Sequence, residues 1–223
     1  MDAKKLAGEK AIEFVKNDMI VGLGTGSTVY WAILKIGGLV KQGLRIKGVP
    51  TSIQTEQLAN ELGIPLVGLS SINQIDLTID GADEANEEFE LIKGGGGALL
   101  REKMVASISK RMVVVMDETK YVPNLGKFPL PVEITQFGWE MTRRQISALG
   151  CEPALRLKDN IPFITDNGNY ILDCHFGEIL DANKLNQTLN MIPGVVENGL
   201  FVNMADTMVI GNRNGHVDIF YKS

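Results

Sequence analysis

The chain has 223 residues, of which 44% are hydrophobic and 22% charged, a balance typical of a globular protein and unlike disordered or collagen-like chains. This length suffices for one large domain or two small ones. The formal net charge of −5 excludes a broad electrostatic attraction to nucleic acid or to an anionic membrane.

Cysteine and histidine are both scarce. Cys151 and Cys174 are too few for a disulfide framework. His175 and His216 have no further Cys or His nearby at metal-ligand spacing, so we expect no metal site. The N-terminus lacks an apolar signal core, and the chain contains no run of about 18 apolar residues. We therefore expect a reduced, cytoplasmic protein without a membrane partner.

The first half of the chain alternates between short apolar runs and segments with helical periodicity. Residues 7–15 carry apolar side chains at helical spacing. Strands are expected at residues 19–21, 46–49, 65–69, 75–79 and 112–116, and helices at 7–15, 29–34, 53–62 and 98–109. Strands that alternate with helices predict βαβ units and a mostly parallel sheet.

The pattern changes near residues 126–131, where two prolines and a lysine indicate a domain junction. Asn167-Gly168 predicts a hairpin flanked by residues 163–164 and 170–172. Further strands are expected at residues 132–134, 154–157, 199–202, 207–210 and 217–221, and helices at 139–149 and 182–189. This order predicts a small α+β domain of the split βαβ type. The strands at 207–210 and 217–221 are expected to return to the first sheet.

A glycine-bearing loop, Gly24-Thr25-Gly26-Ser27-Thr28 (loop 24–28), follows the first predicted strand. In open α/β sheets, ligands bind at the carboxyl ends of strands. This loop offers backbone N–H groups and three hydroxyls to a phosphate at a helix N-terminus. It matches neither the Walker order nor the full G-x-G-x-x-G pattern, so a dinucleotide is not indicated. The alternative is a tight turn with Ser27 or Thr28 as the helix N-cap.

A second loop, Asp80-Gly81-Ala82-Asp83-Glu84, places three carboxylates within five residues directly after a predicted buried strand. Such carboxylates repel one another unless they have partners. Sugar hydroxyls, a metal ion and acid–base chemistry are all compatible with them. The lack of further metal ligands favours sugar hydroxyls, and the alternative is an acidic loop that caps a helix.

A third loop carries four consecutive glycines, Gly94 to Gly97 (the glycine loop), between Lys93 and a predicted helix that contains Glu102. Four glycines exceed what a tight turn needs, and they let backbone N–H groups approach an oxygen-rich ligand. With the charge of Lys93 and the carboxylate of Glu102, the loop indicates a site that stabilises a negative intermediate and moves a proton. The alternative is a flexible surface loop.

In a fourth loop, Lys120 is placed to reach a phosphate, or else belongs to a solvated charged segment.

These loops, in this order, resemble the ribose-5-phosphate isomerase A family, and the resemblance spans nearly the whole chain. A departure at residues 202–206 lies outside the catalytic loops. The motifs that carry the resemblance are Thr25-Gly26-Ser27-Thr28, Asp80-Gly81-Ala82-Asp83, Lys93-Gly94-Gly95-Gly96, Arg101-Glu102-Lys103, Gly126-Lys127-Phe128-Pro129-Leu130-Pro131-Val132-Glu133, Thr165-Asp166-Asn167-Gly168-Asn169 and Ile192-Pro193-Gly194-Val195-Val196.

The resemblance implies interconversion of D-ribose 5-phosphate and D-ribulose 5-phosphate through a cis-enediolate, in the non-oxidative branch of the pentose phosphate pathway, without metal or organic cofactor. It implies a Rossmann-like catalytic domain at residues 1–128 and 205–223. A ferredoxin-like α+β domain at residues 129–204 would be inserted and would serve oligomerisation. Proteins of this family are usually homodimers or homotetramers, and the resemblance gives no nucleic-acid partner.

The resemblance also implies residue roles. Glu102 is the base, and Lys93 with the N–H groups of the glycine loop stabilises the enediolate. Asp80 and Asp83 hold sugar hydroxyls, and one of the two assists opening of the furanose ring, with Asp80 preferred over Asp83. The phosphate is held by Lys4, Ser27, Thr28 and Lys120. The remaining substrate-binding residues are Thr25, Gly26, Gly81, Ala82, Gly94, Gly95 and Gly96.

Three alternatives remain on sequence alone. A sugar-phosphate-binding sensor module of the same fold would need no base, so Glu102 argues against it. A coenzyme A transferase would use a glutamate nucleophile on a longer chain. An amino-sugar-phosphate deaminase would need a histidine near its carboxylates, and neither His175 nor His216 lies in the loops named above.

Overall fold

The computed structural model describes residues 2–222 and divides into two compact units. Unit 1 consists of Met1–Ala82, Arg101–Tyr121 and Met204–Ser223, and unit 2 of Asp83–Leu100 and Val122–Asn203. The sequence predicted the divisions at residues 128/129 and 204/205. The compact units therefore differ from the predicted domains chiefly in residues 83–100 and 122–128, which group with unit 2. Among the described helices, none has both the length and the apolarity needed to cross a membrane.

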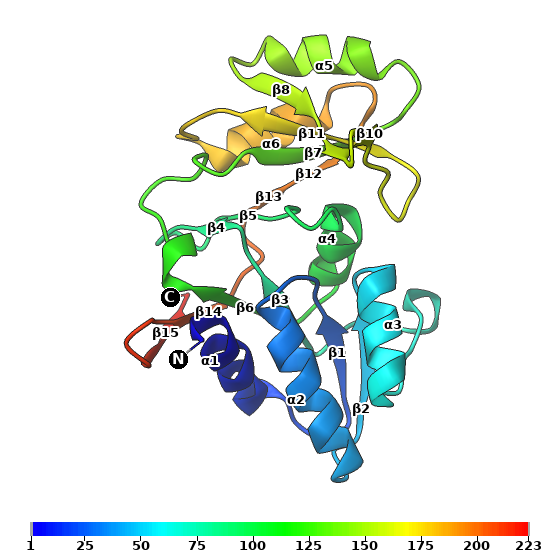
Figure 1. Ribbon diagram of the computed structural model, residues 1–223, viewed down its shortest axis with the longest axis vertical. Helices are drawn as coiled ribbons and strands as arrows, with labels where there is room; N and C mark the ends of the chain where they lie inside the picture. The colour runs from blue at the N-terminus through cyan, green and yellow to red at the C-terminus, as the bar shows by residue number, and fades with distance from the viewer. Residues whose placement is uncertain (1, 223) are drawn as a thin grey trace. The chain divides into compact units, whose positions relative to one another are not determined.

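Unit 1 is built on a six-stranded sheet in the order β15-β14-β6-β3-β1-β2 (Figure 1). All neighbouring strands are parallel except β14 and β15, which pair antiparallel. The predicted mostly parallel sheet and the return of the last two strands are thus confirmed. The strands are β1 (Met19–Leu23), β2 (Ile46–Pro50), β3 (Leu77–Gly81), β6 (Met112–Asp117), β14 (Thr207–Gly211) and β15 (Val217–Tyr221).

Helices cover both faces of this sheet because successive strand residues point to opposite sides. Val21 packs in the core beneath α1 and α2, whereas its neighbour Ile20 packs with Val49 and with Val105 of α4 on the other face. The helices of this unit are α1 (Ala3–Lys10), continued by the 3₁₀ turn η1 (Ala11–Phe14), α2 (Val29–Lys41), α3 (Ile53–Leu62) and α4 (Leu99–Ser107), which starts in unit 2.

Local sequence sets the helix ends. The side chain of Asp2 accepts from the N–H groups of Lys4 and Lys5, which begins α1. Ser52 caps α3 in the same way through the N–H of Thr55, and Gly63 ends that helix with a φ of 74°. The predicted helix at residues 53–62 is confirmed with these bounds.

One predicted strand, residues 65–69, is wrong. Only a single bridge joins Leu66 to Gly48, and the 3₁₀ turn η2 (Leu69–Ser71) follows. Pro65 has no N–H to donate to a ladder, which limits pairing here. The strand predicted at residues 75–79 starts later, at Leu77, because Ile75 makes only an isolated bridge with Ser109.

Unit 2 contains a four-stranded antiparallel sheet in the order β12-β7-β11-β8 (Figure 1). Along the chain its elements follow one another as strand, helix, strand, strand, helix, strand, which confirms the predicted split βαβ arrangement. They are β7 (Leu130–Ile134), α5 (Trp139–Ser147), β8 (Glu152–Leu155), β11 (Tyr170–His175), α6 (Ala182–Asn190) and β12 (Val195–Asn198).

The turn at residues 165–169 is confirmed, because the N–H of Thr165 donates to the carbonyl of Asn169 and Gly168 has a φ of 80°. Its predicted partner strand at residues 163–164 is wrong. The chain turns earlier, where Asp159 and Asn160 have positive φ, and pairs β9 (Leu157–Lys158) with β10 (Ile161–Pro162).

A small antiparallel sheet, β13-β5-β4, completes unit 2. Its strands are β4 (Glu84–Ala85), β5 (Leu91–Ile92) and β13 (Leu200–Phe201). Each spans two residues, which is too short for an alternating pattern, so β4 and β5 were not predicted.

Candidate active site

The loops that the sequence singled out in unit 1 follow strands at the centre of the parallel sheet (Figure 1). β2 lies on one side of β1 and β3 lies on the other, so the strand order changes direction between β1 and β3. Open α/β sheets bind ligands at such a topological switch point. Loop 24–28 follows β1, and Asp80 lies near the end of β3, so both lie at that crevice.

Asp80 is fully buried, and its carboxylate is bound to loop 24–28. Its Oδ1 accepts from the N–H of Thr25 at 3.1 Å and from the N–H of Gly81 at 2.8 Å. A Cβ added at Gly24 would lie 2.1 Å from this oxygen. The glycine at position 24 is therefore required by the approach of Asp80.

The hydroxyl of Thr25 belongs to a cluster of hydroxyls at the start of α3. Its Oγ1 lies 2.8 Å from Thr51 Oγ1, 2.8 Å from Ser52 Oγ and 3.2 Å from Thr55 Oγ1. Thr55 in turn donates to the carbonyl of Gly24 at 2.9 Å. Both polar groups of Thr25 that the sequence assigned to a ligand, its hydroxyl and its N–H, are thus engaged inside unit 1.

Lys4 and Ser27, far apart in sequence, meet at the start of α2. The Nζ of Lys4 donates to Ser27 Oγ at 3.0 Å. Thr28 is the N-cap residue but makes no side-chain capping bond, so its hydroxyl does not satisfy the helix N–H groups. A cation, an exposed hydroxyl and a helix N-terminus are the groups that bind a phosphate.

A cleft of about 490 Å³ opens beside loop 24–28. It lies next to the Lys4 and Ser27 pair and gives a small ligand access to the loop. Its lining consists of Gly24, Gly26, Ser27, Tyr30, Trp31, Ile33, Gln54, Thr55 and Leu58.

Lys120 lies at the carboxyl end of β6, beside β3 in the sheet. It ends the 3₁₀ turn η3 (Glu118–Lys120), which Asp117 caps by accepting from the N–H of Thr119 at 3.0 Å. The structure therefore brings Lys120 to the same end of the sheet as loop 24–28 and Asp80.

Glu102 lies in the first turn of α4 and is 4% exposed. The same helix packs on the sheet through Val105, whose Cγ1 would lie 2.8 Å from a Cβ at Gly22. The positive end of the helix dipole favours a carboxylate in this first turn. A buried carboxylate is thus held on a helix that is fixed against the sheet.

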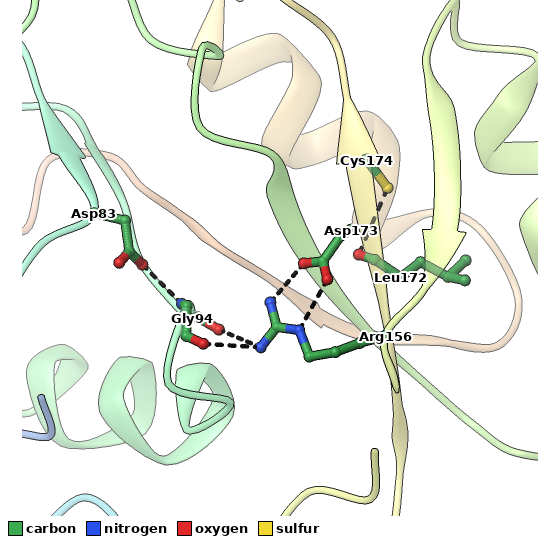
Figure 2. A network of polar contacts seen from close by, with 7 residues as sticks. Asp83, Gly94, Arg156, Leu172, Asp173 and Cys174 are labelled. Atoms are coloured by element: carbon green, nitrogen blue, oxygen red, sulfur yellow. Dashed lines mark hydrogen bonds and ion pairs between the residues drawn. The ribbon is translucent and has the colours of Figure 1, made fainter. Parts of the chain in front are cut away.

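In unit 2, the two remaining carboxylates of the acidic loop have separate partners. Asp83 Oδ2 accepts from the N–H of Gly95 at 2.7 Å (Figure 2). Glu84 is buried and accepts from the N–H groups of Gly126 and Phe128, each at 2.7 Å. Glu84 therefore fixes the backbone of residues 126–128 by hydrogen bonds, whereas Asp83 is hydrogen-bonded to the glycine loop.

The glycine loop has a defined conformation. Gly94 and Gly97 have φ values of 100° and 84°, and the N–H of Gly97 donates to the carbonyl of Gly94 at 3.0 Å. The N–H groups of Gly95 and Gly97 are thus engaged within unit 2, which narrows the set of donors predicted for a ligand. Lys93 precedes the loop, is 2% exposed, and has its Nζ 5.4 Å from the ring centroid of Phe201.

Sequence reasoning missed Arg156. Its Nη1 donates to the carbonyl oxygens of Gly94 at 2.9 Å and Gly95 at 3.2 Å. Figure 2 shows the guanidinium of Arg156 directed at Gly94. No motif surrounds this arginine, and about sixty residues separate it from the loop. Its contact with the loop is therefore visible only in three dimensions.

The remaining candidate groups lie elsewhere. His175 and His216 are exposed. Within residues 2–222, no group of three or more His, Cys, Asp or Glu side chains has the geometry to hold a metal ion. Cys151 and Cys174 are free thiols, and the hydrogen bond between them together with burial raises the pKa of Cys174, which stays neutral.

The fold and these groups define an α/β protein equipped for a small phosphorylated ligand. The family model described as ribose 5-phosphate isomerase A (phosphoriboisomerase A) matches residues 47–215. Ribose-5-phosphate isomerase A of Bacillus mycoides (strain KBAB4) is 57% identical over 216 residues, which cover 96% of this chain and 98% of that protein. The corresponding protein of Listeria innocua is 49% identical, and the match covers all of both chains.

Solved structures agree. The ribose 5-phosphate isomerase of Plasmodium falciparum is 41% identical with a TM-score of 0.96, covering 99% of this chain and 98% of that one. A D-ribose-5-phosphate isomerase in complex with phospho-erythronic acid is 39% identical with the same TM-score and coverage. The chain belongs to the ribose-5-phosphate isomerase A family.

Proposed function

We propose that this chain, a ribose-5-phosphate isomerase of the pentose phosphate pathway, moves the proton between C2 and C1 of its substrate with the carboxylate of Glu102. Aldose–ketose isomerisation through a cis-enediolate needs a base, a group that stabilises the developing oxyanion, and a grip on the phosphate. One carboxylate can remove the proton at C2 and return it at C1. The burial of Glu102 in the first turn of α4 carries this proposal, because it shields the carboxylate from bulk water.

The phosphate is held at the start of α2. Lys4 and Ser27 are already in contact, and the N-terminal N–H groups of α2 add donors of the kind that bind phosphate. Thr28 and Lys120 complete the proposed set. This grip on an unreactive part of the substrate supplies binding energy that orients the reacting carbons.

The sugar and the enediolate are served by Asp80, Asp83, Lys93 and the glycine loop. Asp80, fixed by two N–H groups, assists opening of the furanose ring, and Asp83 accepts sugar hydroxyls. Lys93 supplies positive charge that stabilises the enediolate. The N–H groups of the glycine loop other than those of Gly95 and Gly97, which are bonded to Asp83 and to the Gly94 carbonyl, add hydrogen bonds to it. Pre-placed donors of this kind are worth about 3–4 kcal/mol each in other oxyanion sites.

The solved relative in complex with phospho-erythronic acid supports the proposal that the site of this family binds a phosphorylated sugar derivative. That ligand carries both a phosphate and a carboxylate, so a site that accepts it must serve two anionic groups. We propose that the present chain binds it as well, with its phosphate at Lys4 and Ser27. Membership in the isomerase family decides against the sensor module and the other enzymes considered from sequence alone.

The test is Glu102→Gln, which keeps the side-chain volume and removes the base. We expect kcat for ribulose 5-phosphate formation to fall about 100- to 10,000-fold, while phospho-erythronic acid still binds in calorimetry. The exposed Glu88→Gln serves as the matched control and should keep full activity. Assays include EDTA, so that activity lost on chelation would contradict a cofactor-free reaction. Activity retained by Glu102→Gln would transfer the role of base to another group, with Asp80 and Asp83 tested next.

We also propose that the chain acts in the cytoplasm as a homodimer or homotetramer that assembles through unit 2. Large apolar side chains of this unit are strongly exposed: Phe137 is 94%, Leu180 86% and Met191 82% exposed. Exposed apolar side chains of this kind indicate a protein–protein contact where they form one contiguous patch. Analytical ultracentrifugation tests the assembly, and a monomer at micromolar concentration would contradict it.

A further inference from the structure

Arg156 is fixed between two parts of unit 2. It follows β8, and its N–H donates to the carbonyl of Ile171 on β11 at 2.9 Å. Its own carbonyl accepts from the N–H of Phe163 at 2.9 Å. Its side chain is only 15% exposed. Both the backbone and the guanidinium of this residue are therefore held in place.

The guanidinium divides its donors between a carboxylate and the glycine loop (Figure 2). Nε and Nη2 bind the two oxygens of Asp173 at 2.9 and 2.5 Å. Nη1 binds the carbonyl oxygens of Gly94 and Gly95 at 2.9 and 3.2 Å. The two-point contact with Asp173 fixes the plane of the guanidinium, and thereby the direction of the remaining donors.

The carbonyl contacts decide where the loop N–H groups point. In a trans peptide the C=O and the following N–H point in opposite directions. Because Arg156 binds the carbonyls of Gly94 and Gly95, the N–H groups of Gly95 and Gly96 face away from it. The N–H of Gly95 indeed reaches Asp83 Oδ2 at 2.7 Å on the other side (Figure 2). Gly96 is exposed, so its N–H lies in a segment open to a ligand.

Phe163 constrains the other end of the same loop. Its ring centroid lies 5.9 Å from the Cζ of Arg156. A Cβ added at Gly97 would lie 2.5 Å from the Cζ of Phe163. Four glycines in sequence have little conformational preference of their own. The conformation of this loop is therefore imposed from outside, by Arg156 at one end and Phe163 at the other.

We propose that Arg156, clamped by Asp173, is a positioning residue for the isomerisation. By binding the carbonyls of Gly94 and Gly95 it directs one N–H at Asp83 and presents the next, that of Gly96, to the substrate. This inference rests on the proposed function, in which Asp83 and the glycine loop contact the sugar. In this proposal Arg156 acts through the glycine loop and not directly on the substrate or on the base.

An arginine is needed at this position for a geometric reason. Its planar fork binds a carboxylate at two points and still has a donor left for two carbonyls. A lysine at position 156 would offer a single ammonium group, so it would have to share one nitrogen between Asp173 and the loop. Arg156→Lys should therefore retain only part of the kcat that is lost in Arg156→Met.

The experiment compares Arg156→Met, Arg156→Lys and Asp173→Asn for kcat and KM per folded chain, with folding checked by circular dichroism and thermal melting. We expect Arg156→Met to lower kcat about 10- to 100-fold, because misplacing a reacting group by about 1 Å costs this much. KM should change less, because the proposed phosphate site lies on other residues. Arg156→Lys should have a kcat between those of Arg156→Met and the parent. The double variant Arg156→Met with Asp173→Asn should lose less kcat than the product of the two single losses, because both substitutions disrupt the same contact.

Arg143→Met is the matched control. Arg143 also binds a backbone carbonyl in unit 2, that of Pro153 at 2.8 Å, whereas the carbonyls of Gly94 and Gly95 accept from Arg156. It should keep the parent kcat. Equal losses in Arg143→Met and Arg156→Met would show a general loss of packing and overturn the inference, as would full kcat in folded Arg156→Met. If Arg156→Met does not fold, Asp173→Asn decides, and an unchanged kcat there overturns the inference. Activity retained by Glu102→Gln would instead reject the proposed function.

Discussion

Gly24 and Asp80 pack directly against each other at the centre of the parallel sheet. A Cβ on Gly24 would lie 2.1 Å from Oδ1, 2.4 Å from Cγ and 2.6 Å from Cα of Asp80. The loop after β1 and the end of β3 therefore hold each other in place, and the N–H of Thr25 completes the contact. Two motifs that sequence analysis treats separately depend on each other for their geometry.

Gly24→Ala should consequently impair both stability and activity. The new methyl group must displace the buried side chain of Asp80 or the loop, and overpacking of this kind costs about 1–3 kcal/mol. We expect a lower midpoint of denaturant unfolding and a reduced kcat. Gly38→Ala in α2 is the control, since a Cβ there meets nothing within 4 Å and alanine favours a helix by about 0.5–1 kcal/mol. A Gly24→Ala variant with parent stability and kcat would refute this coupling.

Thr25→Val removes the hydroxyl that joins Thr51, Ser52 and Thr55 while keeping the shape of the side chain. The partners left buried without this hydroxyl should cost about 1–3 kcal/mol of unfolding free energy. Thr25→Ser keeps the hydroxyl and should remain closer to the parent protein. Chemical denaturation measures the difference, and equal stability of the serine and valine variants would show that the cluster contributes no net stability.

The parallel sheet was predictable because each of its strands leaves a mark in the sequence. The runs at Met19 and Met112 are continuously apolar, as expected for strands buried on both faces. The segment at Pro65 misled because it is apolar and short, and the missing N–H of proline had more effect than the hydrophobic pattern. The two-residue strands β4 and β5 are held by tertiary pairing and leave no periodic pattern at all.

The candidate site was predictable to the extent that its chemistry lies in contiguous motifs. Loop 24–28, the acidic loop and the glycine loop are visible because unusual residues occur side by side in sequence. The partners of those motifs were not visible. The hydroxyl of Thr25 bonds to a buried hydroxyl cluster, and Glu84 accepts from the N–H of Gly126. Arg156 donates to the glycine loop from its position between β8 and β9. Each of these contacts is set by packing between distant segments, for which a single sequence carries no signal.

Acid stability should depend on Asp76. Its carboxylate accepts from Lys110 Nζ at 2.8 Å and from the N–H of Ile20 at 2.9 Å, and these bonds hold its pKa below the usual aspartate value. A carboxyl with a lowered folded-state pKa stabilises the fold above its unfolded-state pKa, and this contribution disappears as the pH falls through the folded-state value. Asp76→Asn should therefore reduce the stability lost on acidification below about pH 4.

Urea unfolding between neutral pH and pH 3 measures this effect. Glu88→Gln removes an exposed carboxyl with no such pair and should leave the acid dependence as in the parent. The Asp76–Lys110 pair is partly exposed, with side-chain exposures of 31% and 54%, so added salt should weaken its effect. An identical acid dependence in Asp76→Asn and the parent would contradict the assignment.

Lys4 and its neighbour Lys5 allow a matched test of the proposed phosphate site. The Nζ of Lys4 contacts Ser27 Oγ, whereas that of Lys5 lies 5.3 Å from the ring centroid of Trp31. Lys4→Met removes a charged donor worth about 1.5–3 kcal/mol, so kcat/KM should fall about 10- to 100-fold. Lys5→Met removes the same charge one residue away and should change kcat/KM little. Inorganic phosphate, tested as a competitive inhibitor, should bind Lys4→Met more weakly than Lys5→Met. Equal inhibition constants in the two variants would show that the phosphate does not bind at Lys4 and would contradict the proposed site at the start of α2.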